Sequence, residues 1–186
     1  ITMKVQKKVA VIGATGNIGE KLVPLLIEQG IEVRAIGRSK DKLAKLAAKG
    51  AKTFAGAFDD LEFLTSALKG ADSVFALIPP EYAAEDFRGR QNIVGDIIAK
   101  AIEESGVKRV VNLSSLGAEQ SEGVGPINGL HDQEVRLNKI RGIRLTHLRP
   151  TYFFENILFG LHPIKEHNVY GTAVNADVAF PQVATI

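Results

Sequence analysis

The chain of 186 residues is long enough for one domain, or for one domain and part of a second. Apolar residues make up 45% and charged residues 24%, which excludes a chain that is disordered or coiled-coil throughout. The lack of cysteine excludes disulfides, zinc–thiolate sites and thiol nucleophiles, and a net charge of only +2 argues against a nucleic-acid binder driven by bulk charge.

Short apolar runs and helical patterns alternate along the chain from its N-terminus. The first run, Val9–Ile12, is typical of a strand buried on both faces, and it ends at Gly13. Apolar residues from Ile18 to Leu26 then recur at helical spacing, and Gly30 closes this segment. We expect further strands over residues 31–36, 52–55, 73–78, 108–113 and 143–148. We expect helices near residues 43–47, 61–68, 94–102 and 130–141, with a loop over 117–129.

Regular alternation of strands and helices with short connections predicts an α/β fold with a doubly wound, Rossmann-like parallel sheet and helices on both faces. We expect a dinucleotide-binding domain over residues 4–150 and the start of a substrate-binding lobe over residues 151–186. Because the last residues form an apolar run typical of a strand, we expect this lobe to be incomplete and the natural protein to continue. In such sheets, ligands bind at the carboxyl ends of the strands.

Three glycines spaced three residues apart lie between the first strand and the first helix. Gly13 suits a tight turn, Gly16 lets the backbone approach a pyrophosphate, and Gly19 lets the helix pack on the strand. The helix N-terminus offers free N–H groups to the anion. The alternative is a glycine turn without a ligand. The residues expected to hold the cofactor here are Gly13, Thr15, Gly16, Asn17, Ile18 and Gly19.

Basic residues gather just after the second strand. Residues 30–52 contain seven basic side chains and two acidic ones, which favours a small anionic ligand. Arg38 is the first residue after that strand, where an acid would select NAD and an arginine accommodates the 2′-phosphate of NADP. We therefore expect NADP(H) to be preferred over NAD(H). The alternative is a solvated, basic helix start.

Motifs spread over the chain resemble those of the NmrA-like branch of the atypical short-chain dehydrogenases. They are Gly-Ala-Thr-Gly-Asn-Ile-Gly at 13–19, Gly-Arg-Ser at 37–39, Leu-Ile-Pro-Pro at 77–80, Asn-Leu-Ser-Ser at 112–115 and Leu-Arg-Pro-Thr-Tyr-Phe-Phe-Glu-Asn at 148–156. The resemblance implies an NADP-binding α/β protein, either a reductase of quinones or azo dyes or a redox-sensing regulator.

The resemblance also implies which residues line the cofactor. Beyond the glycine loop they are Arg38, Phe58, Leu77, Ile78, Pro79, Pro150, Tyr152 and Phe153. One departure concerns the end of the third strand, where the family usually has Gly-Asp and this chain has Gly56-Ala57. The contact to the adenine edge is then expected from the backbone of Phe58.

The catalytic residues are less clearly marked. Main-line short-chain dehydrogenases place a serine after the fifth strand and Tyr-x-x-x-Lys on the next helix, where the tyrosine donates a proton. This chain has Ser114 at the strand end but no tyrosine or lysine pair on the helix, which carries His131. We consider Ser114 and His131 as catalytic candidates. The alternatives are a serine that forms a turn and a histidine bonded to the backbone or to Glu134. We expect no metal site.

Two functions from different classes remain open. The first is an NADPH-dependent oxidoreductase that passes hydride to a flat, electron-poor acceptor such as a quinone. The second is a non-catalytic NADP(H)-sensing protein that acts through a protein partner. No run of 18 apolar residues and no secretory signal occur, so we expect a cytoplasmic protein without a membrane span. We expect no direct binding to nucleic acid, and the oligomeric state is left open.

Overall fold

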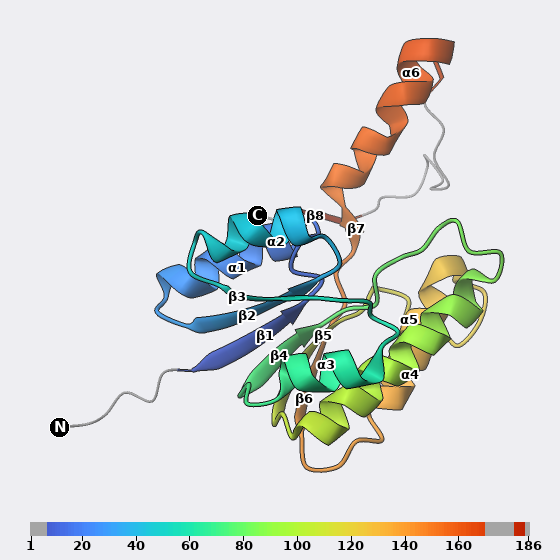
Figure 1. The fold of residues 1–186 in the computed structure, drawn as a ribbon. Helices are drawn as coiled ribbons and strands as arrows, with labels where there is room; N and C mark the ends of the chain where they lie inside the picture. Colours follow the sequence, from blue (N-terminus) through green and yellow to red (C-terminus); the bar gives the residue numbers. More distant parts are fainter. Residues whose placement is uncertain (1–6, 170–180, 185–186) are drawn as a thin grey trace. The chain divides into compact units, whose positions relative to one another are not determined.

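Six parallel strands form one sheet in the order β3-β2-β1-β4-β5-β6 (Figure 1). This computed structural model describes residues 7–169 and 181–184. The chain divides into two units, one ending at Arg149 and the other beginning at Pro150. The strands are β1 (Lys8–Ile12), β2 (Glu32–Gly37), β3 (Lys52–Ala55), β4 (Ser73–Ala76), β5 (Arg109–Leu113) and β6 (Arg144–Leu148).

Helices cover both faces of this sheet, as Figure 1 shows. On one face lie α1 (Gly19–Glu28) and α2 (Lys40–Ala47). On the other face lie α3 (Leu61–Leu68), α4 (Phe87–Ser105) and α5 (Asn128–Leu137), which follows the short 3₁₀ helix η1 (Gly125–Ile127). This arrangement confirms the predicted doubly wound, Rossmann-like fold.

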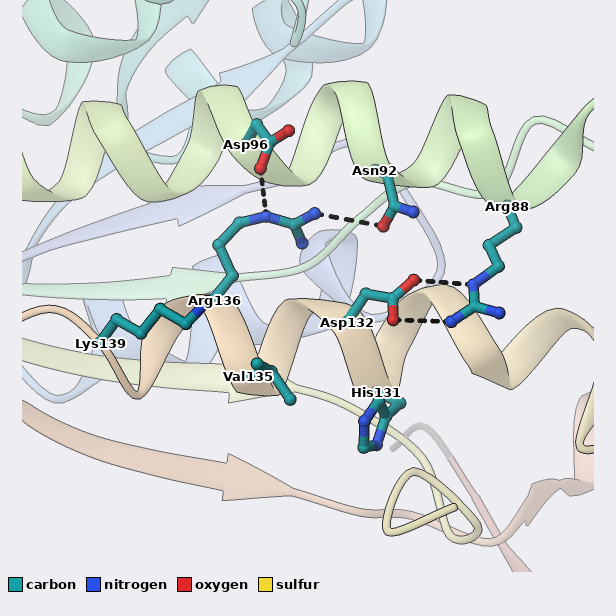
Figure 2. A pocket seen from close by; sticks show the side chains of 8 residues that line it. All are labelled: Arg88, Asn92, Asp96, His131, Asp132, Val135, Arg136 and Lys139. Atoms are coloured by element: carbon teal, nitrogen blue, oxygen red, sulfur yellow. Dashed lines mark hydrogen bonds and ion pairs between the residues drawn. The ribbon is translucent and has the colours of Figure 1, made fainter. Parts of the chain in front are cut away.

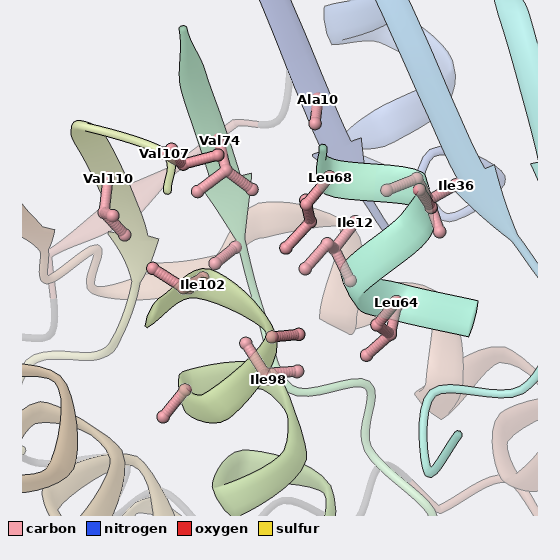
Figure 3. Close-up of a cluster of buried hydrophobic side chains, with 14 of the residues drawn as sticks. Ala10, Ile12, Ile36, Leu64, Leu68, Val74, Ile98, Ile102, Val107 and Val110 are labelled. Atoms are coloured by element: carbon pink, nitrogen blue, oxygen red, sulfur yellow. The ribbon is translucent and has the colours of Figure 1, made fainter. Parts of the chain in front are cut away.

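The alternation of side chains along the strands divides the core into two layers. Ala10, Ile12 and Ile36 face α3 and α4, and Figure 3 shows this layer with Leu64 and Ile98 from the helices. The intervening residues face α1 and α2; they are Val11, Val33 and Ala35. Because most positions of the central strands β1 and β4 are buried on one face or the other, these strands appear in the sequence as continuous apolar runs.

Side-chain caps determine where several helices begin, and hence how long the loops at the carboxyl edge of the sheet are. Ser39, Asp60 and Asp86 each accept a hydrogen bond from a backbone N–H three residues later, at the starts of α2, α3 and α4. Such caps satisfy N–H groups that have no partner inside the helix. At its other end, α4 stops at Gly106 in the left-handed conformation.

Among the elements that differ from their sequence-based bounds are the fourth strand and the helix after η1. The strand expected over 73–78 ends at Ala76, because Pro79 and Pro80 have no N–H with which to continue a ladder. The helix expected over 130–141 spans Asn128–Leu137 instead, so it begins directly after η1 and stops earlier.

The second unit contains shorter elements. They are β7 (Tyr152–Phe153), the 3₁₀ helix η2 (Phe154–Gly160), α6 (Leu161–His167) and β8 (Gln182–Val183). Strands β7 and β8 pair in parallel. Across the described ranges 7–169 and 181–184, no helix is both long and apolar enough to cross a membrane.

Candidate functional site

The strand order reverses between β1 and β4, and the glycine loop begins at the end of β1, beside this point. Gly13 follows β1 with φ of +75°, a conformation that side-chain-bearing residues rarely adopt. The N–H of Gly16 donates to the carbonyl of Gly13 at 3.0 Å, which closes the turn. The loop therefore returns at once toward the sheet and starts α1 over the end of β1.

The other two glycines, Gly16 and Gly19, differ in how much space surrounds them. A Cβ on Gly19 would lie 2.4 Å from the carbonyl oxygen of Gly13 and 2.5 Å from Cα of Ala14, so the backbone packs too closely for any side chain. Among the residues that the structure describes, a Cβ on Gly16 would have the same carbonyl oxygen, at 3.4 Å, as its only neighbour within 4 Å. Packing of the protein explains the glycine at 19 but leaves open space beside Gly16.

Backbone donors without a backbone acceptor follow Gly16 directly in the chain. Helix α1 begins without a side-chain cap, because the residue before it is Ile18. Among the described residues, no backbone carbonyl accepts the N–H of Asn17 or Ile18. Gly16 and Asn17 are also exposed. Unpaired N–H groups at a helix N-terminus suit an anion, so this loop fits the pyrophosphate of a dinucleotide.

Thr15 and Leu77 hold the loop against its neighbours. Thr15 lies over the end of β2, where a Cβ on Gly37 would come within 2.9 Å of its methyl group. Leu77, the first residue after β4, lies 3.1 Å from the position of a Cβ on Gly13. After Leu77 come the buried Ile78 and the half-buried Pro79. The structure thus places Leu77 beside the glycine loop, and the expected contact of residues 77–79 with the cofactor stays a prediction.

Arg38 begins the loop after β2, and its side chain is 57% exposed. Its guanidinium lies 5.7 Å from the ring centroid of Phe58, which is buried to all but 7%. One of its nitrogens lies 3.4 Å from Oε1 of Glu81. The two residues predicted near the adenosine end, Arg38 and Phe58, are therefore in contact with each other.

Two acids beside Arg38 share a second arginine. Arg90 from α4 donates through Nε to Glu81 at 2.8 Å and through a terminal nitrogen to Asp59, also at 2.8 Å. These hydrogen bonds from Arg90 hold the pKa of both carboxyl groups below their usual range. Both acids therefore carry their negative charge at neutral pH.

Ser114 lies at the end of β5 in a buried polar network. Its hydroxyl donates to Oε1 of Glu134 at 2.5 Å, and both residues are at most 4% exposed. Arg149, at the end of β6, binds the same carboxylate through Nε at 2.9 Å and a terminal nitrogen at 2.5 Å. Burial raises the pKa of Glu134, but the bonds from Arg149 and Ser114 outweigh it and hold that pKa below its usual range.

His147 on β6 lies next to this network. Its Nδ1 is 3.1 Å from the amide nitrogen of Asn112, and its Nε2 is 3.2 Å from the amide oxygen of Asn138. Burial is the main cause that lowers its pKa. Amide side chains thus engage both ring nitrogens of His147, which is typical of a structural histidine.

His131, the second catalytic candidate, lies on α5 beside a pocket of about 530 Å³ between α4 and α5 (Figure 2). Its Nδ1 donates to the carbonyl of Ala118 at 2.8 Å. Ion pairs cross this pocket, and the pair of Arg88 with Asp132 has two contacts of 2.8 Å. No residue of the glycine loop is among those that line this pocket.

Pro150, Tyr152 and Phe153, the remaining residues expected at the cofactor, belong to the second unit. Tyr152 and Phe153 form β7 there, and their part in binding stays a prediction. Sequence reasoning missed Glu81 and Arg90, and it considered Glu134 only as a partner of His131. For Glu134 a signal exists, because it shares one helix face with Leu130 and Leu137, where a buried acid needs a partner.

Comparison with known proteins agrees with this geometry. NAD(P)H azoreductase of Xenophilus azovorans is 30% identical over 160 residues, which are 85% of this chain and 52% of that protein. Quinone oxidoreductase 2 of Escherichia coli is 29% identical over 177 residues, 92% of this chain and 58% of that protein. The crystal structure of an NADPH-dependent quinone oxidoreductase from Escherichia coli in complex with NADPH has a TM-score of 0.70 at 26% identity, covering 86% of this chain and 54% of that one.

The chain thus spans between half and three fifths of the length of these relatives. The model of the NmrA-like family matches residues 5–182. This range includes the glycine loop, the 77–79 segment and both ends of the Ser114–Arg149 network. Together with the Rossmann-like sheet, this match establishes that the chain belongs to the NmrA-like family.

Proposed function

We propose that this chain is the cofactor-binding part of an NADPH-dependent oxidoreductase that passes hydride to a flat, electron-poor acceptor such as a quinone. The observation that carries the proposal is the glycine loop. The space beside Gly16 is left open by the protein, and the N–H groups of Asn17 and Ile18 are without backbone acceptors among the described residues. The names of the relatives, an azoreductase and quinone oxidoreductases, support reduction of flat acceptors.

The residues that would hold the cofactor are those of the glycine loop for the pyrophosphate and Arg38 for the 2′-phosphate. When bound, NADPH supplies the hydride, and the chain contributes binding and orientation. We propose that NADPH is preferred over NADH, because Arg38 is exposed and no acid occupies residues 36–39. Since a bond from a charged group to phosphate contributes about 1.5–3 kcal/mol, Arg38→Ala should reduce the preference roughly 10- to 100-fold. Equal losses for NADPH and NADH would refute this role.

The choice of acceptor follows from how the two catalytic candidates, Ser114 and His131, are bonded. The only proton of the Ser114 hydroxyl is donated to Glu134, and the Nδ1 proton of His131 is donated to Ala118. Reduction of a simple ketone creates an alkoxide that needs a proton from a positioned acid. A reduced quinone is stabilised by its ring and can take protons from water. Hydride transfer to it then depends mainly on proximity to the cofactor.

The test is steady-state oxidation of NADPH by the complete natural protein with a panel of quinones, azo dyes and aliphatic ketones. We expect turnover with quinone-like acceptors and little with ketones, and a loss of less than about 100-fold in His131→Ala. Efficient ketone reduction that His131→Ala abolishes would contradict the proposal and make His131 the acid. Micromolar NADPH binding without turnover of any acceptor would favour a non-catalytic sensor. A cytoplasmic location stays a prediction.

A further inference from the structure

An ion pair lies at the carboxyl edge of the sheet, near the point where the glycine loop begins. Arg38 follows β2 and Glu81 lies in the loop after β4, and β1 lies between these two strands (Figure 1). The contact of 3.4 Å between Arg38 and Glu81 therefore spans the end of β1, beside the turn at Gly13. A side chain 43 positions away in sequence thus touches the residue proposed to recognise the 2′-phosphate.

Glu81 is held firmly, whereas Arg38 is held weakly. Arg90 binds both carboxylate oxygens of Glu81, at 2.8 Å and 3.4 Å, and its hydrogen bond keeps the pKa of Glu81 below the usual range. Arg38 has five N–H donors, and within the described residues its one hydrogen bond is the long contact to Glu81. Its side chain is also more exposed than that of Glu81, at 57% against 31%. An incoming anion would find Arg38 accessible but partly neutralised.

We propose that Glu81 is a specificity-determining residue whose carboxylate competes with the 2′-phosphate of NADPH for Arg38. The proposal rests on the role of Arg38 in the proposed function. NADH has no 2′-phosphate, so its binding does not involve this competition. Glu81 therefore lowers the preference for NADPH, and it does so without leaving its own partner, because Arg90 still neutralises the carboxylate when Arg38 turns to a phosphate.

The size of the effect follows from exposure. A solvent-exposed pair at 3.4 Å is screened by water and salt, so its removal releases only a small part of the Coulomb attraction. We expect Glu81→Gln to tighten NADPH about 3- to 10-fold and to leave NADH within about twofold. The glutamine side chain retains an oxygen that accepts from Nε of Arg90, so the loop keeps its anchor. The gain should shrink as salt is added.

The experiment measures dissociation constants of NADPH and NADH by calorimetry on the complete natural protein. Glu119→Gln is the matched control, because Glu119 also pairs with an arginine at 3.4 Å but does not contact Arg38. It removes the same charge and should leave the ratio of the two constants unchanged. The double variant Arg38→Ala with Glu81→Gln should bind NADPH no more tightly than Arg38→Ala alone. The fragments 2′,5′-ADP, which carries the 2′-phosphate, and 5′-AMP, which lacks it, should show the same changes in affinity as NADPH and NADH.

Three results would overturn the proposal. They are an unchanged ratio in Glu81→Gln, an equal gain for NADPH and NADH, and a gain that persists in the background of Arg38→Ala. Because the readout is binding, it is separate from the test of the proposed function. A protein that reduces no acceptor can still confirm the role of Glu81, and an active quinone reductase can still refute it.

Discussion

The two glycines at 16 and 19 allow a matched test of what the loop is for. Both change by one methyl group when mutated to alanine, and both lie in the same turn. In Gly19→Ala, the new Cβ would lie 2.4 Å and 2.5 Å from backbone atoms of Gly13 and Ala14, which side-chain motion cannot relieve. In Gly16→Ala, the new Cβ has one neighbour, at an ordinary contact distance of 3.4 Å.

The two variants should therefore differ in which property they change, the unfolding free energy or the affinity for NADPH. Relief of the contacts in Gly19→Ala requires a shift of about 1 Å between the start of α1 and the turn at Gly13 and Ala14, and overpacking of this kind costs roughly 1–3 kcal/mol of unfolding free energy. Gly16→Ala should change the unfolding free energy by less than about 1 kcal/mol. Its methyl group would nevertheless lie where the pyrophosphate approaches the backbone, so NADPH affinity should fall at least about tenfold, or 1.4 kcal/mol.

Urea denaturation and calorimetry with NADPH measure the two effects on the same proteins. Gly16→Val, with two further methyl groups, should extend the loss of binding while the fold is retained. A folded Gly16→Ala or Gly16→Val protein with unchanged NADPH affinity would refute the reasoning, because the open space beside Gly16 would then have no part in binding. Equal stability of Gly19→Ala and the parent protein would refute the packing argument separately.

Three further predictions concern the stability of the fold. Arg34→Met should lower the unfolding free energy by roughly 2–3 kcal/mol in urea denaturation, because Nε of Arg34 donates to the carbonyl of Ala67 at 2.7 Å and the guanidinium lies over Phe54; a loss below 0.5 kcal/mol would contradict this. Glu134→Ala should cost about 1–3 kcal/mol of unfolding free energy, since it leaves the Ser114 hydroxyl buried without its acceptor, and a normal melting temperature would speak against it. Because burial lowers the pKa of His147, the unfolded chain takes up the proton first as the pH falls below about 6.5. The stability that the neutral ring confers is therefore present above that pH and is lost as the pH falls through the pKa of the folded state. In a plot of unfolding free energy against pH, His147→Gln should flatten this part of the curve. An unchanged curve would exclude His147 as the source of the pH dependence.

Local patterns were sufficient to predict the sheet. The apolar run Val9–Ile12 and its successors are strands because both faces of a central parallel strand are buried, which requires apolar residues at consecutive positions. The glycines at 13, 16 and 19 were also predictable, since a turn, an open approach and a close packing contact each require a missing side chain within seven residues. These features depend on short-range geometry, and the structure reproduces them.

Long-range polar partners were not predictable in the same way. Arg34 counts toward the basic segment in sequence, yet it lies inside the protein and binds carbonyl groups at the end of α3, 33 residues away. Glu81 and Arg90 meet only because β4 ends early and α4 begins at Phe87. A contact of this kind depends on how two elements pack against each other, and one sequence does not record that packing.

The buried arginine on β2 has a consequence for how the sheet assembles. Arg34 and Ile36 point toward α3, whereas Ala35 between them points toward α1 and α2. A slip of β2 by one residue would turn every side chain to the opposite face. The guanidinium would then lie among Val23 and Leu43, far from the carbonyl groups of α3 that it now binds. An unpaired charge in that layer is costly, so Arg34 penalises the misaligned sheet more than any aliphatic residue could and thereby selects a single alignment.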